Sequence, residues 1–289
     1  MDLLEKIAPL PDVFAHWFAS RGWMPRAHQL DLLAKAQAGR SVLLIAPTGG
    51  GKTLAGFLPS LVELSDLHLC PRPREEGSAL RSLISTGRNV RREGGLHTLY
   101  ISPLKALAVD IARNLEMPVA EMRLPIRIET RTGDTPVSKR QRQRRDPPDI
   151  LLTTPEQLAL LLASADAPYL FGSLKRVVLD ELHALVTSKR GDLLSLGLAR
   201  LFRLAPGLAS IGLSATVAEP EELCRFMVPQ RGGNARADLI VAAAGAAPQV
   251  TMLDSTERLP WAGHSARYAL AELYALIKTH RTTLVFVNT

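Results

Sequence analysis

A glycine-rich segment between an apolar run and a helical pattern has the residue types that bind phosphate. Its residues are Ala46, Pro47, Thr48, Gly49, Gly50, Gly51, Lys52 and Thr53. Consecutive glycines let backbone N–H groups surround phosphate oxygens, the lysine amine contacts the β and γ phosphates, and the next hydroxyl binds Mg²⁺. The general pattern begins with glycine where this chain has alanine, a residue small enough for the turn. We therefore predict a P-loop, and the alternative is a glycine-rich turn that binds nothing.

Two acids, Asp180 and Glu181, directly follow the apolar run Arg176–Leu179. Ligands of parallel α/β sheets bind at the carboxyl ends of the strands, so we expect both acids to face the P-loop. Asp180 would then hold Mg²⁺ together with Thr53, and Glu181 would act as the general base toward water. Without a P-loop, such a pair is usually a solvated turn. His183, taken alone, is explained as well by packing or capping as by catalysis.

The elements that must position these residues are short apolar runs separated by helical patterns. The runs are Ser41–Ile45, Leu96–Ile101, Ile126–Thr132, Ile150–Thr153, Arg176–Leu179 and Ala209–Leu213. This alternation predicts an α/β fold with a mainly parallel sheet flanked by helices. Val42–Ile45 and Val177–Leu179 are apolar throughout, which is typical of central strands buried on both faces.

The composition indicates a folded domain with a sizeable core. The chain has 289 residues, of which 46% are hydrophobic and 22% charged, and its net charge of +7 permits a polyanionic partner without proving one. Cys70 and Cys224 lie far apart and predict neither a disulfide framework nor a zinc site. The amino terminus lacks a secretory pattern and no apolar run reaches about 18 residues, so we expect a cytoplasmic protein without a membrane span.

Two polar tracts interrupt the alternating pattern. The segment from Cys70 to Gly95 is predicted to be a surface insertion, and Ser138–Pro148 is predicted to be a solvated helix that its prolines end. The cations of the second tract are Lys139, Arg140, Arg142, Arg144 and Arg145. They either widen a nucleic-acid groove or form an ordinary solvated face, and the pattern favours the solvated face.

The order of these motifs resembles that of superfamily 2 helicases. The P-loop, Asp180–His183 and the segment Ser214, Ala215 and Thr216 resemble motifs I, II and III, and the histidine indicates the DExH branch. Three further segments resemble motif Ia, motif Ib and the adjoining TTPE element. Their residues are Ser102, Pro103 and Lys105; Arg131, Thr132, Gly133 and Asp134; and Thr153, Thr154, Pro155 and Glu156.

Other segments narrow the resemblance to the Lhr group, and within it to the bacterial ligase-associated DExH subgroup. These segments are Trp23–Gln29, Ser188–Asp192, Leu259–His264 and Leu284–Thr289. The resemblance implies ATP-driven translocation on single-stranded DNA in the 3′ to 5′ direction, with unwinding of a duplex or an RNA:DNA hybrid. It also implies a role in DNA repair, with DNA ligase or nuclease partners.

The resemblance assigns roles by position. Gln29, with Arg26 beside it, would read the adenine edge, although a surface glutamine is the alternative. His183 and the hydroxyls of Ser214 and Thr216 would couple hydrolysis to movement of a second domain. Motifs Ia, Ib and TTPE would contact the backbone of the tracking strand without reading its sequence.

The resemblance also predicts the domain organisation and the activity of the chain. Residues 1–243 would form the first RecA-like P-loop NTPase domain, and residues 244–289 the incomplete start of a second one. That start contains the strand-like segments Val250–Leu253 and Thr283–Val287 around a helical pattern from Ala266 to Thr279. Motifs V and VI, which carry the arginine finger, are absent, so we expect ATP and Mg²⁺ binding with slow turnover. A DExH helicase acting on RNA and a nucleotide-gated binding module without turnover are the alternatives.

Overall fold

The computed structural model describes residues 10–69, 95–215, 217, 219–243, 249–253 and 269–286. The chain divides into two compact units, Met1–Gly245 and Ala246–Thr289. Most of the predicted insertion after Cys70 lies outside the described residues, as does Thr216. The assignment of residues 244–289 to a second RecA-like domain stays a prediction.

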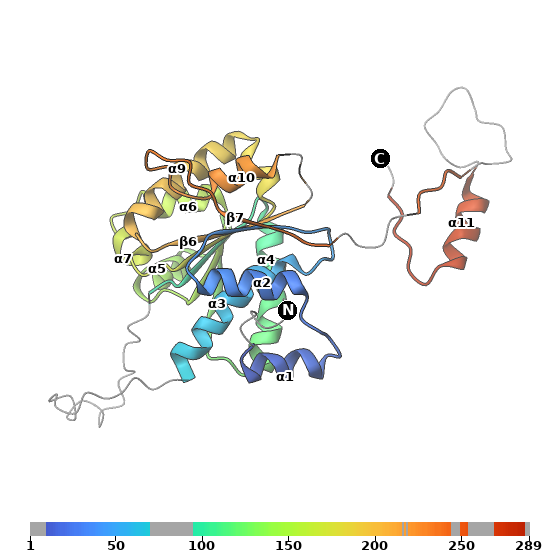
Figure 1. Cartoon of the computed structure of the whole chain (residues 1–289), viewed down its shortest axis with the longest axis horizontal. Coiled ribbons are helices and arrows are strands. Elements are labelled where there is room, and N and C mark those ends of the chain that lie inside the picture. The colour runs from blue at the N-terminus through green and yellow to red at the C-terminus, as the bar shows by residue number, and fades with distance from the viewer. Residues whose placement is uncertain are drawn as a thin grey trace, which may run out of the picture. The chain divides into compact units, whose positions relative to one another are not determined.

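The first unit is built on a parallel sheet of seven strands (Figure 1). Its order is β3-β4-β2-β5-β6-β1-β7. The strands are β1 (Val42–Ile45), β2 (Thr98–Ile101), β3 (Ile128–Arg131), β4 (Ile150–Thr153), β5 (Arg176–Leu179), β6 (Ala209–Ser214) and β7 (Asp238–Val241). The six predicted strands are confirmed, and both β1 and β5 lie between neighbouring strands as expected.

The seventh strand, β7, is absent from the sequence prediction. It pairs in parallel with β1, from Val42 opposite Asp238 to Ile45 opposite Val241. An ion pair of 2.7 Å between Arg40 Nη1 and Asp238 Oδ2 joins the starts of the two strands. The run Asp238–Val241 has the apolar residues of a strand. It is only four residues long and follows the glycine-rich break at 231–234, so the sequence pattern alone does not identify it.

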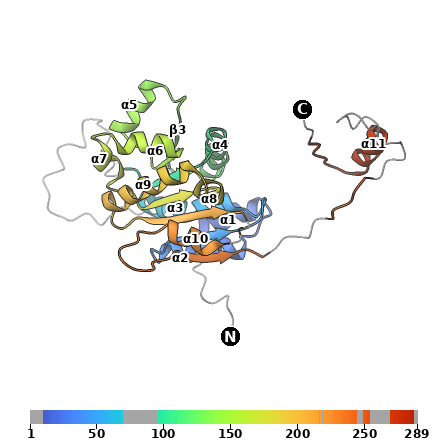
Figure 2. The ribbon, with the colours of Figure 1, turned by 90° about the horizontal axis from the view of Figure 1, so that it is seen from above.

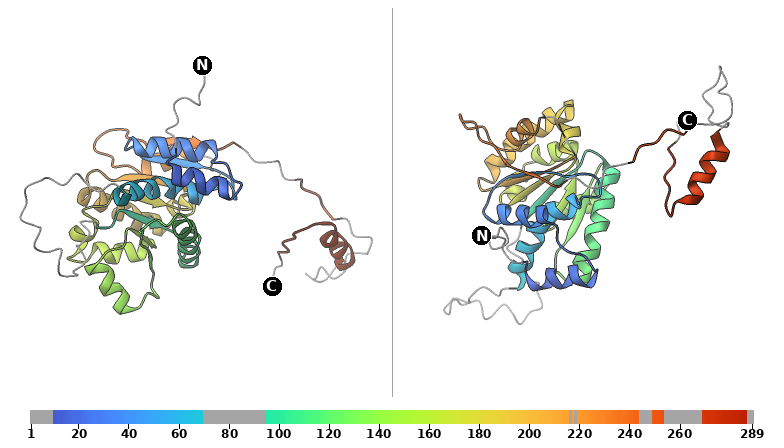
Figure 3. Two further views of the ribbon diagram at one scale, coloured as in Figure 1. Left: turned by 90° about the horizontal axis from the view of Figure 1, so that it is seen from below. Right: turned by 45° about the vertical axis from the view of Figure 1, so that its right-hand side comes forward.

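Helices cover both faces of the sheet and make two separate cores (Figures 2 and 3). One core includes α1 (Asp12–Ser20), α2 (Ala27–Gln37), α3 (Lys52–Leu69) and α4 (Lys105–Glu121). The other includes α6 (Pro155–Leu162), α7 (Ala167–Phe171), α8 (Leu182–Val186), α9 (Lys189–Leu204) and α10 (Pro220–Phe226). Successive strand residues face opposite sides, so Val42 and Leu44 enter the first core while Leu43 and Ile45 enter the second.

In the second unit, α11 (Leu270–Thr279) lies within the helix predicted from Ala266 to Thr279. The predicted strands Val250–Leu253 and Thr283–Val287 are wrong over the residues described, which carry no strand at 249–253 or 280–286. A strand forms only where another strand supplies its hydrogen bonds, and an apolar run alone does not meet that condition. None of the helices in the described part of the chain is long and apolar enough to span a membrane.

A buried polar network lies at the amino edge of the sheet. The Arg176 guanidinium donates to Glu63 Oε1, and His97 Nε2 lies 3.2 Å from Glu63 Oε2. Burial alone would raise the pKa of Glu63, but the His97 hydrogen bond and the Arg176 charge outweigh burial and lower it. The Arg176 side chain is 4% exposed, so its charge depends on Glu63 for compensation.

This dependence predicts that Glu63→Gln lowers the free energy of unfolding by about 2 kcal/mol at neutral pH, because a buried guanidinium loses its counter-charge. Since the pKa of Glu63 is lowered in the folded state, the stabilisation is complete above the ordinary value of 4.5 and is lost as the pH falls through the lowered value. Denaturant unfolding at pH 7 and pH 3 measures both effects. The exposed Glu116→Gln on α4 is the control, and equal losses in the two variants would contradict the prediction.

Candidate nucleotide and nucleic-acid site

The predicted P-loop joins the end of β1 to the start of α3. Gly49 and Gly51 both have a φ of 76°, a left-handed conformation that favours glycine. A Cβ added to Gly51 would lie 2.8 Å from Gln29 Nε2, so a side chain would also collide there. Lys52 Nζ donates to the Ala46 carbonyl at 2.8 Å, which folds the lysine back over the loop. The loop thus has the curvature and the cation of a phosphate cradle.

The first turn of α2 is attached to this loop. His28 Nε2 lies 2.9 Å from the Gly50 carbonyl oxygen, and Gln29 Nε2 donates to the Gly51 carbonyl at 3.3 Å. Gln29 Oε1 accepts the Arg26 N–H at 2.9 Å. Gln29 is buried, in contrast to the surface alternative, and its amide keeps one donor hydrogen and one acceptor lone pair for an adenine edge.

Asp180 follows β5 and is held by a residue that the sequence prediction omits, Tyr100 of β2. The buried Tyr100 hydroxyl donates to Asp180 Oδ2, and Asp180 Oδ1 accepts the Glu181 N–H at 3.0 Å. Burial raises the pKa of Asp180, and the Tyr100 hydrogen bond opposes that rise. Tyr100 also stacks on Phe57, with ring centroids 5.1 Å apart. A tyrosine hydroxyl within a fully buried strand must find a hydrogen-bond partner, and this is the sequence signal for the role.

Glu181 has a left-handed backbone, with a φ of 47° and a ψ of 44°, at the start of α8. This conformation is costly for a residue with a side chain, and strained residues of this kind cluster at functional sites. Glu181 Oε2 lies 3.5 Å from His183 Nε2, and the carboxylate is partly exposed. Glu181 therefore remains accessible at the strand end, as a general base requires.

Ser214 connects the P-loop with the acidic motif. Its hydroxyl lies 3.0 Å from His183 Nδ1, and its carbonyl accepts the Ala46 N–H at 3.2 Å. Ala215 follows at the end of β6, which lies between β1 and β5. One buried serine therefore contacts residues of both motifs. The geometry agrees with the coupling role predicted for His183 and Ser214, which stays a prediction.

The residues at this edge fit ATP and Mg²⁺. The cradle has a lysine amine for phosphate, and Thr53 and Asp180 have the hard oxygen atoms that Mg²⁺ prefers. No group of three or more histidines, cysteines or acids in the described residues could hold a metal by itself. This donor set suits Mg²⁺, which typically uses few protein ligands and completes its shell with phosphate oxygens and water.

The three predicted nucleic-acid elements lie along the same sheet edge, after β2, β3 and β4. Ser102 N donates to the Thr153 carbonyl at 3.0 Å, and Thr153 Oγ1 donates to the Arg131 carbonyl at 2.8 Å. Lys105 Nζ lies 3.3 Å from Asp134 and forms an exposed ion pair. Glu156 is paired with Arg190, a contact that the sequence prediction does not include. The structure therefore brings the elements together, while three of their charged side chains, Lys105, Asp134 and Glu156, have partners within the domain.

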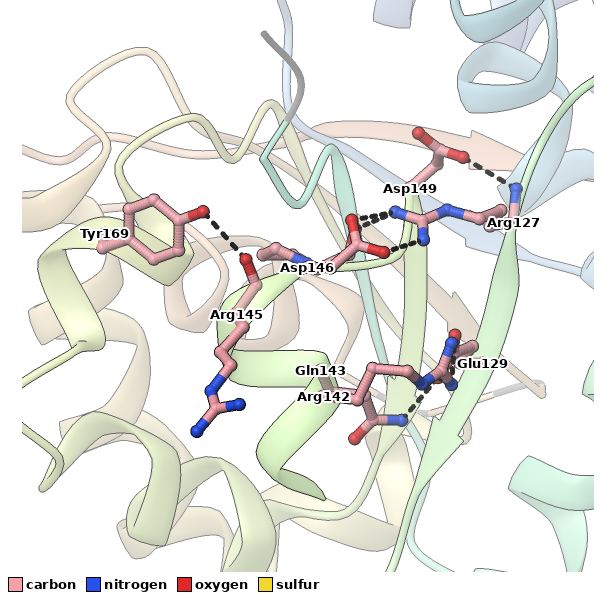
Figure 4. Close-up of polar contacts among 9 residues, drawn as sticks. Arg127, Glu129, Arg142, Gln143, Arg145, Asp146, Asp149 and Tyr169 are labelled. Atoms are coloured by element: carbon pink, nitrogen blue, oxygen red, sulfur yellow. Dashed lines mark hydrogen bonds and ion pairs between the residues drawn. The ribbon is translucent and has the colours of Figure 1, made fainter. Parts of the chain in front are cut away.

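The basic tract forms the predicted polar helix, α5 (Val137–Arg145), beside β3. Arg142 Nη2 contacts both Glu129 oxygens at 2.8 Å, and Gln143 Nε2 donates to Glu129 at 2.9 Å (Figure 4). Arg144 Nε donates to Asp166 at 2.6 Å. The Arg145 guanidinium points away from these contacts (Figure 4). Arg142, Gln143 and Arg144 thus attach α5 to the rest of the domain. Neither the nucleic-acid groove nor the solvated face predicted for the tract includes this role.

Arg140 of the same helix holds the motif Ib loop. Its Nε donates to the Thr135 carbonyl at 2.7 Å, and its Nη2 donates to the Gly133 carbonyl and, at 3.4 Å, to the Thr132 carbonyl. Within the loop, Thr132 N donates to Thr135 Oγ1 at 2.9 Å. One guanidinium therefore satisfies the carbonyls of a tight turn at the sheet edge.

Comparisons with known proteins agree with this arrangement. A solved structure, the Mycobacterium smegmatis helicase Lhr bound to ssDNA and AMP-PNP, is similar with a TM-score of 0.71 and 33% identity, over 97% of this chain and 34% of that chain. The ATP-dependent helicase Lhr-Core protein 2 of Thermococcus barophilus is 35% identical over 97% of this chain and 32% of its own length.

The Lhr helicase/probable uracil glycosylase of Mycolicibacterium smegmatis is 42% identical over 74% of this chain and 14% of its own length. The chain thus spans a third or less of the curated relatives named here. Residues 26–223 match the DEAD/DEAH box helicase family, a region that contains the P-loop, the Asp180–His183 segment and Ser214. The fold is therefore RecA-like, and the chain belongs to the DEAD/DEAH box helicase family and is similar to its Lhr members.

Proposed function

We propose that the chain binds ATP with Mg²⁺ at the carboxyl edge of the sheet and serves an ATP-dependent DNA helicase or translocase of the Lhr type. The observation that carries the proposal is Ser214, whose contacts with Ala46 and His183 bring the P-loop and the acidic motif into one site. The similar Lhr structure bound to ssDNA and AMP-PNP supports single-stranded DNA as the partner.

In the proposed site, Lys52 Nζ leaves the Ala46 carbonyl and donates to phosphate oxygens instead. The P-loop N–H groups orient the phosphates. Thr53 and Asp180 would hold Mg²⁺, which when bound neutralises charge on the phosphate oxygens. Glu181 would accept a proton from water at its exposed carboxylate, and His183 would transmit the change to Ser214. Gln29 would orient the adenine.

The finer assignments are also proposals. The curated relatives are about three times the length of the chain or more, and an arginine from another domain stabilises phosphate charge in related nucleotidases. We therefore propose that the chain alone turns ATP over slowly.

We also propose that the whole protein acts in DNA repair in the cytoplasm, on a duplex or an RNA:DNA hybrid, together with a DNA ligase or nuclease. ATP turnover measured with single-stranded DNA and with RNA tests the partner, and a preference for RNA would overturn the DNA assignment.

Lys52→Ala is expected to weaken ATP binding by about 10- to 100-fold, because the phosphates lose a charged hydrogen-bond donor. Titration with a fluorescent ATP analogue measures the affinity, and circular dichroism checks the fold. Lys175→Ala removes an exposed lysine at the opposite edge of the sheet and serves as the matched control. Equal affinity in folded Lys52→Ala and wild-type chains would remove the P-loop assignment.

Glu181→Gln is expected to keep the affinity for Mg²⁺ and ATP within about twofold while lowering turnover about 100-fold, the usual contribution of a general base. Phosphate release with saturating ATP and single-stranded DNA measures the turnover. Glu222→Gln on α10 is an exposed carboxylate control. Wild-type turnover in Glu181→Gln would exclude Glu181 as the base.

Tyr100→Phe is expected to raise the pKa of Asp180 further, because Asp180 loses a hydrogen bond that favours its ionised form. The gain in nucleotide affinity on adding Mg²⁺ should therefore shrink several-fold, and more at pH 6 than at pH 8. The phenylalanine retains the stacking on Phe57. An unchanged Mg²⁺ dependence at both pH values would show that Tyr100 does not tune Asp180.

A further inference from the structure

One arginine joins two of the elements proposed to contact DNA. Arg190, in the first turn of α9, donates from Nη1 to the Pro103 carbonyl at 2.6 Å. The same guanidinium donates from Nε to Glu156 Oε1 and from Nη2 to Glu156 Oε2 at 3.1 Å. Pro103 follows β2 and Glu156 lies in the first turn of α6, so one planar group connects two separate loops of the sheet edge.

This contact explains an acid on a face proposed to bind phosphates. A free carboxylate at Glu156 would repel a DNA backbone. The Arg190 hydrogen bond lowers the pKa of Glu156 to about 2, even though burial opposes the change. The acid is therefore ionised and neutralised by its partner. The side chains are 37% and 48% exposed, and such pairs add little to global stability, so a role in local geometry fits better than one in folding.

The next residue fixes the position of Arg190. A Cβ added to Gly191 would lie 2.5 Å from the Leu185 carbonyl oxygen and 2.7 Å from that of Val186. Only glycine permits this close approach of the first turn of α9 to the end of α8. Because α8 begins directly after Glu181, the guanidinium is carried by a segment continuous with the acidic motif.

We propose that Arg190 is a positioning residue that fixes Ser102–Lys105 and Thr153–Glu156 relative to each other and to the nucleotide edge. The proposal rests on the proposed DNA function of those two elements. Arg190 engages a carbonyl and a carboxylate at the starts of α4 and α6, and the start of a helix is where backbone N–H groups can bind phosphates. A lysine cannot replace Arg190, because a single amine nitrogen cannot make the three contacts that the planar guanidinium makes from three nitrogen atoms.

The test compares Arg190→Ala, Arg190→Lys and Glu156→Gln with the neighbouring control Lys189→Ala, which removes an exposed cation. Three readouts are made on the 289-residue chain: amide hydrogen exchange at residues 104–108 and 155–159, affinity for a labelled oligo-dT strand over a range of salt, and affinity for a fluorescent ATP analogue. Both Arg190 variants should raise amide exchange in both segments and weaken strand binding about tenfold, with ATP affinity within about twofold of wild type. Glu156→Gln should show the same changes to a smaller degree, and Lys189→Ala should leave the exchange unchanged.

The salt dependence separates positioning from direct phosphate contact. In the double variant Arg190→Ala/Glu156→Gln, which leaves no free carboxylate, a positioning arginine leaves the slope of log K against log salt unchanged. A lost phosphate contact instead reduces the magnitude of that slope by about 0.7 on a single strand. A slope of smaller magnitude in the double variant, together with rescue of strand binding by Arg190→Lys, would overturn the proposal, as would unchanged amide exchange in Arg190→Ala. Failure of the wild-type chain to bind the strand would overturn the proposed DNA function, and the positioning role would then be decided by the amide exchange alone.

Discussion

Parallel strand pairing is the constraint on which this molecule depends. All seven strands of the first unit run in one direction, so every carboxyl end reaches the same edge of the sheet. Segments distant in the sequence thereby become neighbours, such as the P-loop after β1 and the acidic motif after β5. The strand between them, β6, ends in Ser214, which hydrogen bonds with residues of both motifs. The site is therefore a consequence of the sheet order as much as of the motif residues themselves.

The polar groups at this edge are held by protein partners that match their chemistry. Lys52 contacts a carbonyl, Asp180 accepts from Tyr100, and Glu156 is neutralised by Arg190. Each partner limits the positions that a charged side chain can take, which is the physical requirement for a preorganised site. At the opposite edge, the Glu63–Arg176 ion pair is more deeply buried than the Glu156–Arg190 pair.

The sequence predicts the strands well because a strand buried on both faces is apolar throughout, as in β1 and β5. It also predicts the P-loop and the acidic motif, whose residue types follow directly from phosphate and metal chemistry. It misses β7, whose four-residue run is weak, and it assigns strands at Val250–Leu253 and Thr283–Val287 where the described residues have none. Tyr100 and Arg190 lie 80 and 34 positions from the acids that they hold, and only the folded sheet shows those contacts.

The central claim is that the carboxyl edge of the sheet binds ATP through the P-loop and the acidic motif together. The most direct measurement is amide hydrogen exchange of the chain with and without Mg²⁺ and a non-hydrolysable ATP analogue. The account predicts protection at residues 46–53, at 26–29 and at 180–183, with little change at the amino edge around His97. Protection limited to other segments, or no protection at saturating nucleotide, would contradict it.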